Sequence, residues 1–332
     1  MARPRKRTDP TAAARRLMKT MTRNSLRAGA RTVKQVARTA AAQAKPPSGS
    51  GDWLSGRAFG LGGSRRYFLF RPYGVSVSER LPLLVMLHGC SQNARDFANS
   101  TRMNAIAVKS RALVLYPEQD LRFNPNGCWN WYDTKSRQAN AEATTLIAAI
   151  NQVSLLYPVD RKAVAIAGFS AGASMAALLA TRHPERFCAV AMHSGVPPGS
   201  ASSVASAVSA MGGLQRSASL SGPNAWPPML VVHGRKDRVV AFKNAQNAAT
   251  LWANSLGARE GEPRTVQRGK RYAITITDFR VGRRVVVSLN AIDQLGHSWS
   301  GGDGKQRFSD PAGPDTSRLI WRFIERQLQT AR

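Results

Sequence analysis

Three features are scarce in this chain of 332 residues: cysteine, acidic side chains and long apolar runs. The three cysteines, Cys90, Cys128 and Cys188, are too few for a fold held together by disulfides, although one bridge with a free thiol left over stays open. No apolar run reaches the ~18–20 residues that a membrane-spanning helix needs, so we do not expect an integral membrane protein. The basic start lacks an apolar segment with a small-residue cleavage site, so an ordinary secretory signal is not visible.

Motifs for metals and phosphate groups are absent as well. No cluster of His, Cys and acidic residues has the spacing of a metal site, and no phosphate-binding loop is present. The glycine-rich run at residues 60–63 is a weak fragment, because no helix of the dinucleotide-binding type is expected after it. We therefore expect neither a metal ion nor a cofactor.

The shortage of acids leaves a large positive charge. Lys and Arg number 48 against 19 Asp and Glu, which gives a formal net charge of +29. Residues 1–45 contain thirteen of the basic residues and one acid, Asp9, so they hold about +12 of that charge. Such an excess favours an anionic partner, for example nucleic acid, acidic lipid or a charged polymer surface. The plainer alternative is a composition bias spread over solvated surfaces.

Residues 1–50 are predicted to stand apart from the folded domain. They are rich in Ala and in basic side chains, contain no aromatic residue, and run into a linker of Pro, Ser and Gly at 46–51. Such a segment buries too little apolar surface to fold by itself. We expect a largely disordered or helical basic arm that tethers the protein to an anionic surface, followed by a folded domain at residues 51–332.

The centre of that domain is a Gly-x-Ser-x-Gly motif at residues 168–172. A run of small and β-branched apolar residues at 164–167 leads into the motif, and an Ala-rich segment follows it. Strand, tight turn and helix in this order form a nucleophile elbow, which would expose Ser170. The alternative is an ordinary strand-to-helix turn with a capping serine, so the assignment depends on the rest of a triad.

The alternation of strands and helices predicts the fold class. We expect strands at 65–71, 81–87, 112–116, 164–169, 189–192, 229–232, 272–279 and 284–292, and helices at 105–109, 139–156, 175–183, 241–253 and 315–328. This pattern is typical of an α/β protein with a mostly parallel central sheet and helices on both faces. Ligands of such sheets bind beyond the carboxyl ends of the strands. The loops with His88, Ser170, Asp237 and His297 are all expected there.

A serine nucleophile needs a neighbouring base, and the base needs an orienting acid. In an elbow of this kind the serine comes first in the chain, the acid second and the histidine last. His297 is the last histidine and follows a predicted strand, and Asp237 lies between it and Ser170. We therefore predict Ser170, Asp237 and His297 as a catalytic triad.

Other candidates for the base and the acid fit this order less well. The earlier histidines either end a helix or lie at strand ends too early in the chain for a late-strand acid to precede them: His183, His193 and His233. The competing acids, whose simpler role is loop solvation, are Asp293 and Asp303.

The loop after the apolar run 81–87 is predicted to face the serine. Its Cys90 N–H and the N–H of Ala171, the residue after the serine, are expected to form an oxyanion hole. Cys90 and Cys128 both lie on loops at the expected active edge, whereas Cys188 directly precedes a buried strand. We therefore predict a Cys90–Cys128 disulfide, which requires Cα atoms within ~7 Å of each other.

The loop at residues 124–132 is dense in aromatic side chains. It holds Trp129, Trp131 and Tyr132, and aromatic residues on loops often line a binding site. We predict that these three residues, together with Trp299, bind substrate. The alternative is that the loop aromatics fold back over the core.

Together these motifs resemble the polyhydroxybutyrate (PHB) depolymerase-type esterases of the α/β-hydrolase superfamily. The matching stretches are 87–92, 128–132, 168–172, 233–237 and 296–302, the last reading Gly-His-Ser-Trp-Ser-Gly-Gly, within a span from about Trp53 to Gln327. The resemblance implies an α/β-hydrolase catalytic domain and a serine esterase. Its expected substrates are carboxylic esters of the polyhydroxyalkanoate or short-chain type, hydrolysed through an acyl-enzyme.

Several alternatives stay open beside this resemblance. Feruloyl and acetyl-xylan esterases look similar, so the acyl and alcohol parts of the substrate are undecided. The family is often secreted, which predicts an extracellular protein. A cytoplasmic, granule-associated protein is the alternative, because the basic arm stands where a signal is expected. A non-enzyme alternative is a basic protein that binds granules or nucleic acid on a hydrolase scaffold, although nucleic acid is not expected as an obligate partner.

Overall fold

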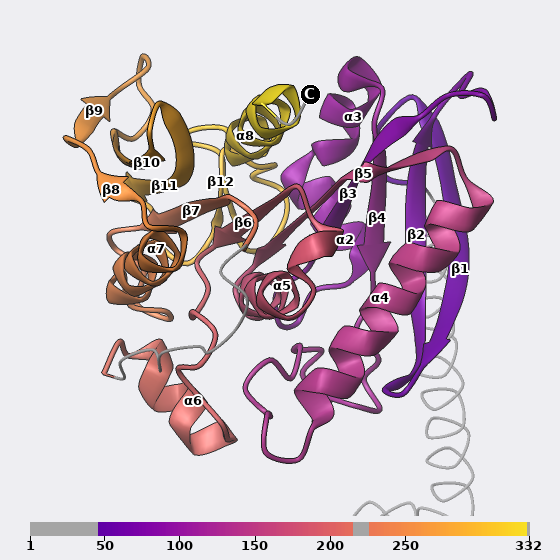
Figure 1. The fold of residues 1–332 in the computed structure, drawn as a ribbon, viewed down its shortest axis with the longest axis horizontal. Coiled ribbons are helices and arrows are strands. Elements are labelled where there is room, and N and C mark those ends of the chain that lie inside the picture. Colours follow the sequence, from indigo (N-terminus) through magenta and orange to yellow (C-terminus); the bar gives the residue numbers. More distant parts are fainter. Residues whose placement is uncertain (1–45, 215–225, 331–332) are drawn as a thin grey trace, which may run out of the picture. The chain divides into compact units, whose positions relative to one another are not determined.

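The computed structural model describes residues 46–214 and 226–330 of the chain (Figure 1). Pro47–Arg332 forms one compact unit. Residues 1–45, most of the predicted basic arm, lie outside the described residues, so the division into arm and folded domain stays a prediction. Within the described ranges, no helix is both long enough and apolar enough to cross a membrane.

An eleven-stranded sheet runs through the described fold (Figure 1). Its strands lie in the order β1-β2-β4-β3-β5-β6-β7-β11-β10-β8, and β9 pairs with β10. The strands are β1 (Gly51–Gly60), β2 (Gly63–Pro72), β3 (Leu81–Leu87), β4 (Leu113–Pro117), β5 (Val159–Phe169), β6 (Ala189–His193), β7 (Met229–Gly234), β8 (Arg259–Glu260), β9 (Arg264–Val266), β10 (Ile274–Val281) and β11 (Arg284–Ile292). From β4 to β11 in this order, neighbours pair in parallel. The pairs at both ends of the sheet are antiparallel.

Helices cover both faces of this sheet. One face packs against α4 (Gln138–Leu156), α5 (Ala171–Arg182) and α7 (Lys243–Leu256), and the other against α2 (Ala94–Thr101), α3 (Met103–Ser110) and α8 (Thr316–Thr330). The expected mostly parallel sheet with helices on both faces is confirmed.

The central strands explain why both faces need helices. Along β3 the side chains of Leu83 and Val85 belong to one core, and those of Leu84 and Met86 to the other. Side chains of a strand alternate between its faces, so a continuous apolar run requires cover on both sides. Because these strands are parallel, the carboxyl ends of β3, β5, β6, β7 and β11 all lie at one edge of the sheet. We call this the carboxyl edge, and the opposite one the amino edge.

The structure differs from the sequence prediction where the apolar pattern is weak. The strand β5 begins at Val159 rather than 164. Its first residues were not predicted as strand, because the charged stretch at 160–162 interrupts the apolar pattern. The helix α2 was not predicted; it is short, and the side chain of Asn93 caps it by accepting the N–H of Asp96. A further helix, α6 (Val204–Met211), was not predicted from the sequence either. Short elements complete the described fold: η1 (Pro184–Arg186), β12 (Trp299–Ser300) and β13 (Ser309–Asp310).

Candidate active site

Ser170 lies in the turn between β5 and α5 at the carboxyl edge. Its backbone has φ 54° and ψ −122°, a conformation that residues other than glycine rarely adopt. The flanking glycines allow the tight turn, since a Cβ on Gly168 would lie 2.2 Å from the carbonyl oxygen of Gly172 and one on Gly172 2.2 Å from that of Leu87. The turn is tied to the next strand because the N–H of Ser170 donates to the carbonyl of His193 at 2.9 Å. This is the geometry expected of an elbow.

The structure brings Ser170, His297 and Asp237 together. His297 follows β11, and its Nε2 lies 2.9 Å from Ser170 Oγ. Asp237 follows β7, and its Oδ2 lies 2.7 Å from His297 Nδ1. With Nδ1–H donating to the carboxylate, Nε2 is left as the acceptor for the serine proton. The three side chains therefore form one hydrogen-bonded chain across the ends of three strands.

The carboxylate of Asp237 is held on every side. Its Oδ1 accepts the N–H groups of Val239 and Val240, both at 2.9 Å. Its Oδ2 faces His297 and also His233, whose Nε2 is 3.4 Å away. Burial alone would raise the pKa of this carboxyl, but the hydrogen bonds with His233 and His297 outweigh it and hold the pKa well below its ordinary range. Asp237 is therefore ionised at neutral pH and can orient His297.

Two more histidines lie behind the triad, and neither contacts Ser170 with its ring. His233 is fully buried, and its Nε2–H donates to the carbonyl of Val240 at 2.8 Å. His193 is fully buried too, and its Nε2 accepts the N–H of Ser300 at 3.3 Å. Burial lowers the pKa of His193 well below its ordinary value, so the ring is neutral. The contact of His233 with Asp237 was missed from the sequence, although the two residues are only four positions apart.

Trp299 supports the triad from within the core rather than lining a cleft. Its side chain has no exposed surface, and its Nε1–H donates to Ser317 Oγ at 3.1 Å. The indole stacks on the ring of His193 with centroids 5.1 Å apart, and the ring of Phe169 lies 5.0 Å from that of His297. The predicted substrate contact of Trp299 is therefore corrected: the burial that lets it pack under the triad keeps it from reaching a bound ester.

The N–H groups of Cys90 and Ala171 are available for an oxyanion. Neither donates a hydrogen bond to another group of the described chain. The carbonyl oxygen of Gly89 lies 2.8 Å from His88 Nδ1, and His88 Nε2 accepts the N–H of Gln119 at 3.1 Å. A planar trans peptide points its C=O and N–H in opposite directions. The contact of His88 with the Gly89 carbonyl therefore also fixes the direction of the Cys90 N–H. Burial lowers the pKa of His88 to about 4, so this ring stays neutral.

A buried carboxylate on α4 organises the segments around this peptide. Glu142 Oε1 accepts hydrogen bonds from Arg65 at 3.2 Å, from Gln119 Nε2 at 2.8 Å and from Asn130 Nδ2 at 2.7 Å. Its Oε2 accepts the backbone N–H of Asn130 at 3.0 Å. Gln119 Nε2 also donates to the carbonyl of Cys128 at 2.9 Å. Glu142 was not singled out from the sequence, where it is a lone acid in an Ala-rich helix.

A disulfide joins Cys90 to Cys128, with Cα atoms 4.3 Å apart. It ties the loop after β3 to the aromatic loop at 124–132, beside the N–H of Cys90. Cys188 is a free thiol, and burial raises its pKa to about 12. It is therefore a poor nucleophile at neutral pH.

The aromatic loop is mostly folded inward. Trp129 has no exposed surface, and its Nε1–H donates to the carbonyl of His88 at 3.0 Å. Trp131 is only 8% exposed and meets the partly buried Tyr132 edge to face. The predicted substrate contact of Trp129 is corrected, because its indole packs in the core and braces the loop of His88. The substrate contacts of Trp131 and Tyr132 stay predictions.

A mostly parallel sheet with a serine elbow after β5, an acid loop after β7 and a histidine loop after β11 defines an α/β-hydrolase. A solved acetyl xylan esterase from Aspergillus awamori has a similar fold, with a TM-score of 0.57 and 19% identity over 74% of this chain and 94% of that one. Among the described residues, no group of three or more His, Cys, Asp or Glu side chains is placed to hold a metal ion.

The chain belongs to the family described as Esterase PHB depolymerase, whose model matches residues 65–260. This range includes Ser170 and Asp237 and ends before His297. The chain is 28% identical to a poly(3-hydroxyalkanoate) depolymerase C from Paucimonas lemoignei, over 59% of this chain and 49% of that protein. It is 29% identical to a feruloyl esterase B from Thermothelomyces thermophilus, over 53% of this chain and 66% of that protein. The chain thus spans about half to two thirds of the length of these relatives, which are named as depolymerases and esterases of the carboxylic-ester hydrolase class.

Proposed function

We propose that the protein is a serine esterase that hydrolyses carboxylic esters, of the polyhydroxyalkanoate or another short-chain type, through an acyl-enzyme. The observation that carries the proposal is the continuous hydrogen-bond chain from Ser170 through His297 to Asp237. Family membership supports the same class of reaction.

The geometry supports a two-step reaction. Ser170 Oγ attacks the ester carbonyl carbon while its proton passes to His297 Nε2, and the N–H groups of Cys90 and Ala171 stabilise the resulting oxyanion. The C–O bond to the alcohol then breaks, and the alcohol leaves with the proton from His297. In the second step water loses a proton to His297 and attacks the acyl carbon. The bond from that carbon to Ser170 Oγ then breaks, Oγ takes the proton back from His297, and the carboxylic acid is released.

A labelling experiment tests the serine directly. The purified full-length protein should react with a fluorophosphonate probe, and Ser170→Ala should abolish that reaction while circular dichroism shows an unchanged fold. Labelling of the variant at the same rate would overturn the assignment. A protein that neither reacts with the probe nor cleaves any ester would favour the non-enzyme alternative of a binding protein on a hydrolase scaffold.

The acyl and alcohol groups need a substrate panel. We expect turnover of p-nitrophenyl esters with short acyl chains and release of soluble acid from amorphous poly(3-hydroxybutyrate). The matching relatives include a depolymerase, feruloyl esterases and acetylxylan esterases, so ethyl ferulate and acetylated xylan belong in the same panel. If ethyl ferulate or acetylated xylan is hydrolysed much faster than the polyester, that compound becomes the proposed substrate in place of the polyester.

We further propose an extracellular protein whose basic arm binds an anionic surface. The Cys90–Cys128 disulfide supports export, because such bonds persist in oxidising compartments. Mass spectrometry after thiol alkylation of the native protein, taken separately from medium and from cells, tests this. Recovery of the protein only from cells, with alkylated Cys90 and Cys128, would favour the cytoplasmic, granule-associated alternative.

A further inference from the structure

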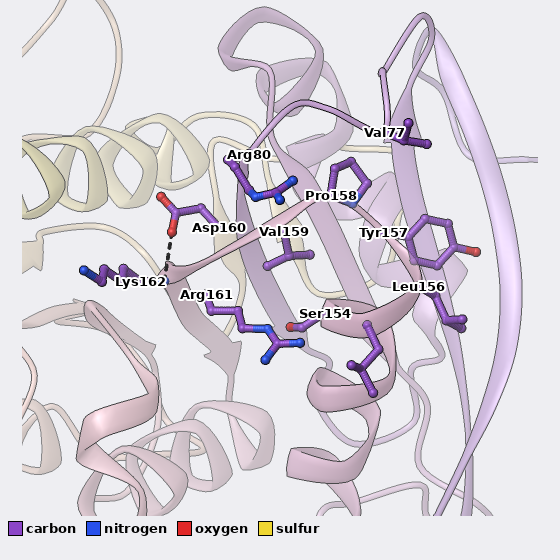
Figure 2. A pocket seen from close by; sticks show the side chains of 11 residues that line it. Val77, Arg80, Ser154, Leu156, Tyr157, Pro158, Val159, Asp160, Arg161 and Lys162 are labelled. Atoms are coloured by element: carbon purple, nitrogen blue, oxygen red, sulfur yellow. Dashed lines mark hydrogen bonds between the residues drawn. The ribbon is translucent and has the colours of Figure 1, made fainter.

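A hollow lies at the amino edge, away from the serine. Its volume is about 600 Å³, within the usual range for small-ligand pockets. It is bounded by the segment before β3, by the carboxyl end of α4 and by the first residues of β5 (Figure 2).

The hollow carries an excess of positive charge. Arg80, Arg161 and Lys162 face a single acid, Asp160, whose Oδ1 accepts the backbone N–H of Lys162 at 3.0 Å. None of the three cations forms an ion pair with another described residue, and the guanidinium of Arg80 donates only to the carbonyl of Glu79. In Figure 2 the side chains of Arg80 and Arg161 lie on either side of Val159.

Two other cations on this side of the sheet are already paired. Arg111 forms an ion pair with Glu79 at 2.6 Å, so the acid that precedes Arg80 in the chain already has a partner. On the neighbouring β1–β2 hairpin, Arg71 pairs with Asp52 at 2.7 Å. The guanidinium groups of the hollow therefore keep most of their donors free, and two such groups together suit the two oxygens of a carboxylate.

Exposed apolar side chains lie beside these cations. Val77, Leu155 and Leu156 are 89%, 74% and 64% exposed, and all three line the hollow. Their burial by an apolar ligand would be favourable, because it removes apolar surface from water. A ligand that satisfies both features has a negatively charged head and a short apolar chain.

We propose that this hollow binds a small amphiphilic carboxylate, with its head between Arg80 and Arg161 and its alkyl chain against Leu155, Leu156 and Val77. Hydrolysis of an aliphatic ester releases an acid of this class. That link to the reaction product rests on the proposed function, whereas the binding itself does not.

Calorimetric titration of full-length Ser170→Ala with sodium octanoate tests the proposal without turnover. We expect one octanoate per chain, bound at least tenfold more tightly than acetate, which lacks the chain. Octylammonium should not bind, because it carries the opposite charge on the same chain. Equal binding of octylammonium would overturn the proposal, and octyl phosphate binding more than tenfold tighter would replace the carboxylate by a phosphate head.

Variants localise the binding. In the same Ser170→Ala background, Arg80→Gln with Arg161→Gln should weaken octanoate binding at least tenfold. The matched control, Arg268→Gln with Lys270→Gln, removes two exposed cations elsewhere and should stay within twofold. Leu156→Asp adds a charge where the chain would lie and should also weaken binding tenfold. Equal losses in the control, or none in the hollow variants, would overturn the site even if Ser170 proves to be the nucleophile.

Discussion

The active site at the carboxyl edge and the hollow at the amino edge hold their polar groups in opposite states. In the active site these side chains are buried and paired, as in the four hydrogen bonds to Glu142 and the contacts around Asp237. At the amino edge Arg80 and Arg161 are exposed and have no ion-pair partner among the described residues. Buried and satisfied groups hold a fixed geometry, which suits catalysis. Exposed and unpaired groups have mobile side chains and unused hydrogen-bond donors, which suits the binding of a ligand.

The comparison predicts the largest loss at the serine itself. Ser170→Ala should lower turnover of a soluble p-nitrophenyl ester by about 10⁵-fold and leave the melting temperature nearly unchanged, because only one hydroxyl is removed. Steady-state kinetics with freshly purified protein measure this. Turnover near that of the wild type would show that the hydrogen-bonded chain at the carboxyl edge is not the catalytic one.

The acid should come next. Asp237→Asn replaces the carboxylate that orients His297, and we expect turnover to fall about 10³–10⁴-fold with little change in KM. The matched control is Asp293→Asn, which removes an acid paired with Arg235 at the surface and should leave turnover within twofold. A larger effect of Asp293→Asn would move the acid of the triad to that position.

Which of these features could be predicted depended on how local they are. Ser170 was predicted from a short motif, and His297 from its order in the chain. The role of Glu142 could not be predicted, because it depends on α4, the Gln119 loop and the aromatic loop meeting in the folded protein. Composition also does not say which way a ring faces, so Trp129 and Trp299 were expected in a cleft and lie in the core. The early start of β5 was missed because charged residues interrupt its apolar pattern.

The neutral ring of His88 makes the stability of the carboxyl edge depend on pH. Its pKa is lowered to about 4 by burial, against an ordinary value of about 6.5. Between these values the unfolded chain binds more protons, so the free energy of unfolding falls as the pH drops from 6.5 to 4, by roughly 3 kcal/mol. Urea unfolding of the wild type and of His88→Asn at pH 7 and pH 4.5 should show a smaller pH dependence in the variant. Identical dependences would contradict a buried neutral ring.

Glu142→Gln should cost less, because it disturbs the oxyanion donor only through its neighbours. The amide nitrogen introduced by glutamine would face the donors of Gln119 and Asn130, so their segments should shift and kcat should fall about tenfold, with KM nearly constant. Asp278→Asn is the control, since Asp278 is another buried carboxylate, paired with Arg264 at 2.7 Å near the far end of the sheet. If both variants lose stability but only Glu142→Gln loses kcat, the effect belongs to the carboxyl edge.

The smallest effect is expected from the basic arm. The first residue of β1, Gly51, pairs with Pro72 at the amino edge, so the chain enters the sheet at the end away from Ser170. Deletion of residues 1–45 should leave turnover of a soluble ester within twofold. Co-sedimentation with anionic vesicles at low salt should fall, because about +12 of charge is removed. A large loss of turnover would make the arm part of the fold, and unchanged co-sedimentation would leave its charge without a partner.

The distances along the chain between the triad residues also bear on how the protein folds. Ser170 and His297 are 127 positions apart, and Asp237 and His297 are 60 apart. Their hydrogen bonds close only after β7 has docked beside β6 and β11 beside β7, and long loops of this kind close late in folding. Helical signal should therefore recover before ester turnover when the denatured chain is diluted into buffer. Recovered turnover would then report the docking of the last parallel strand.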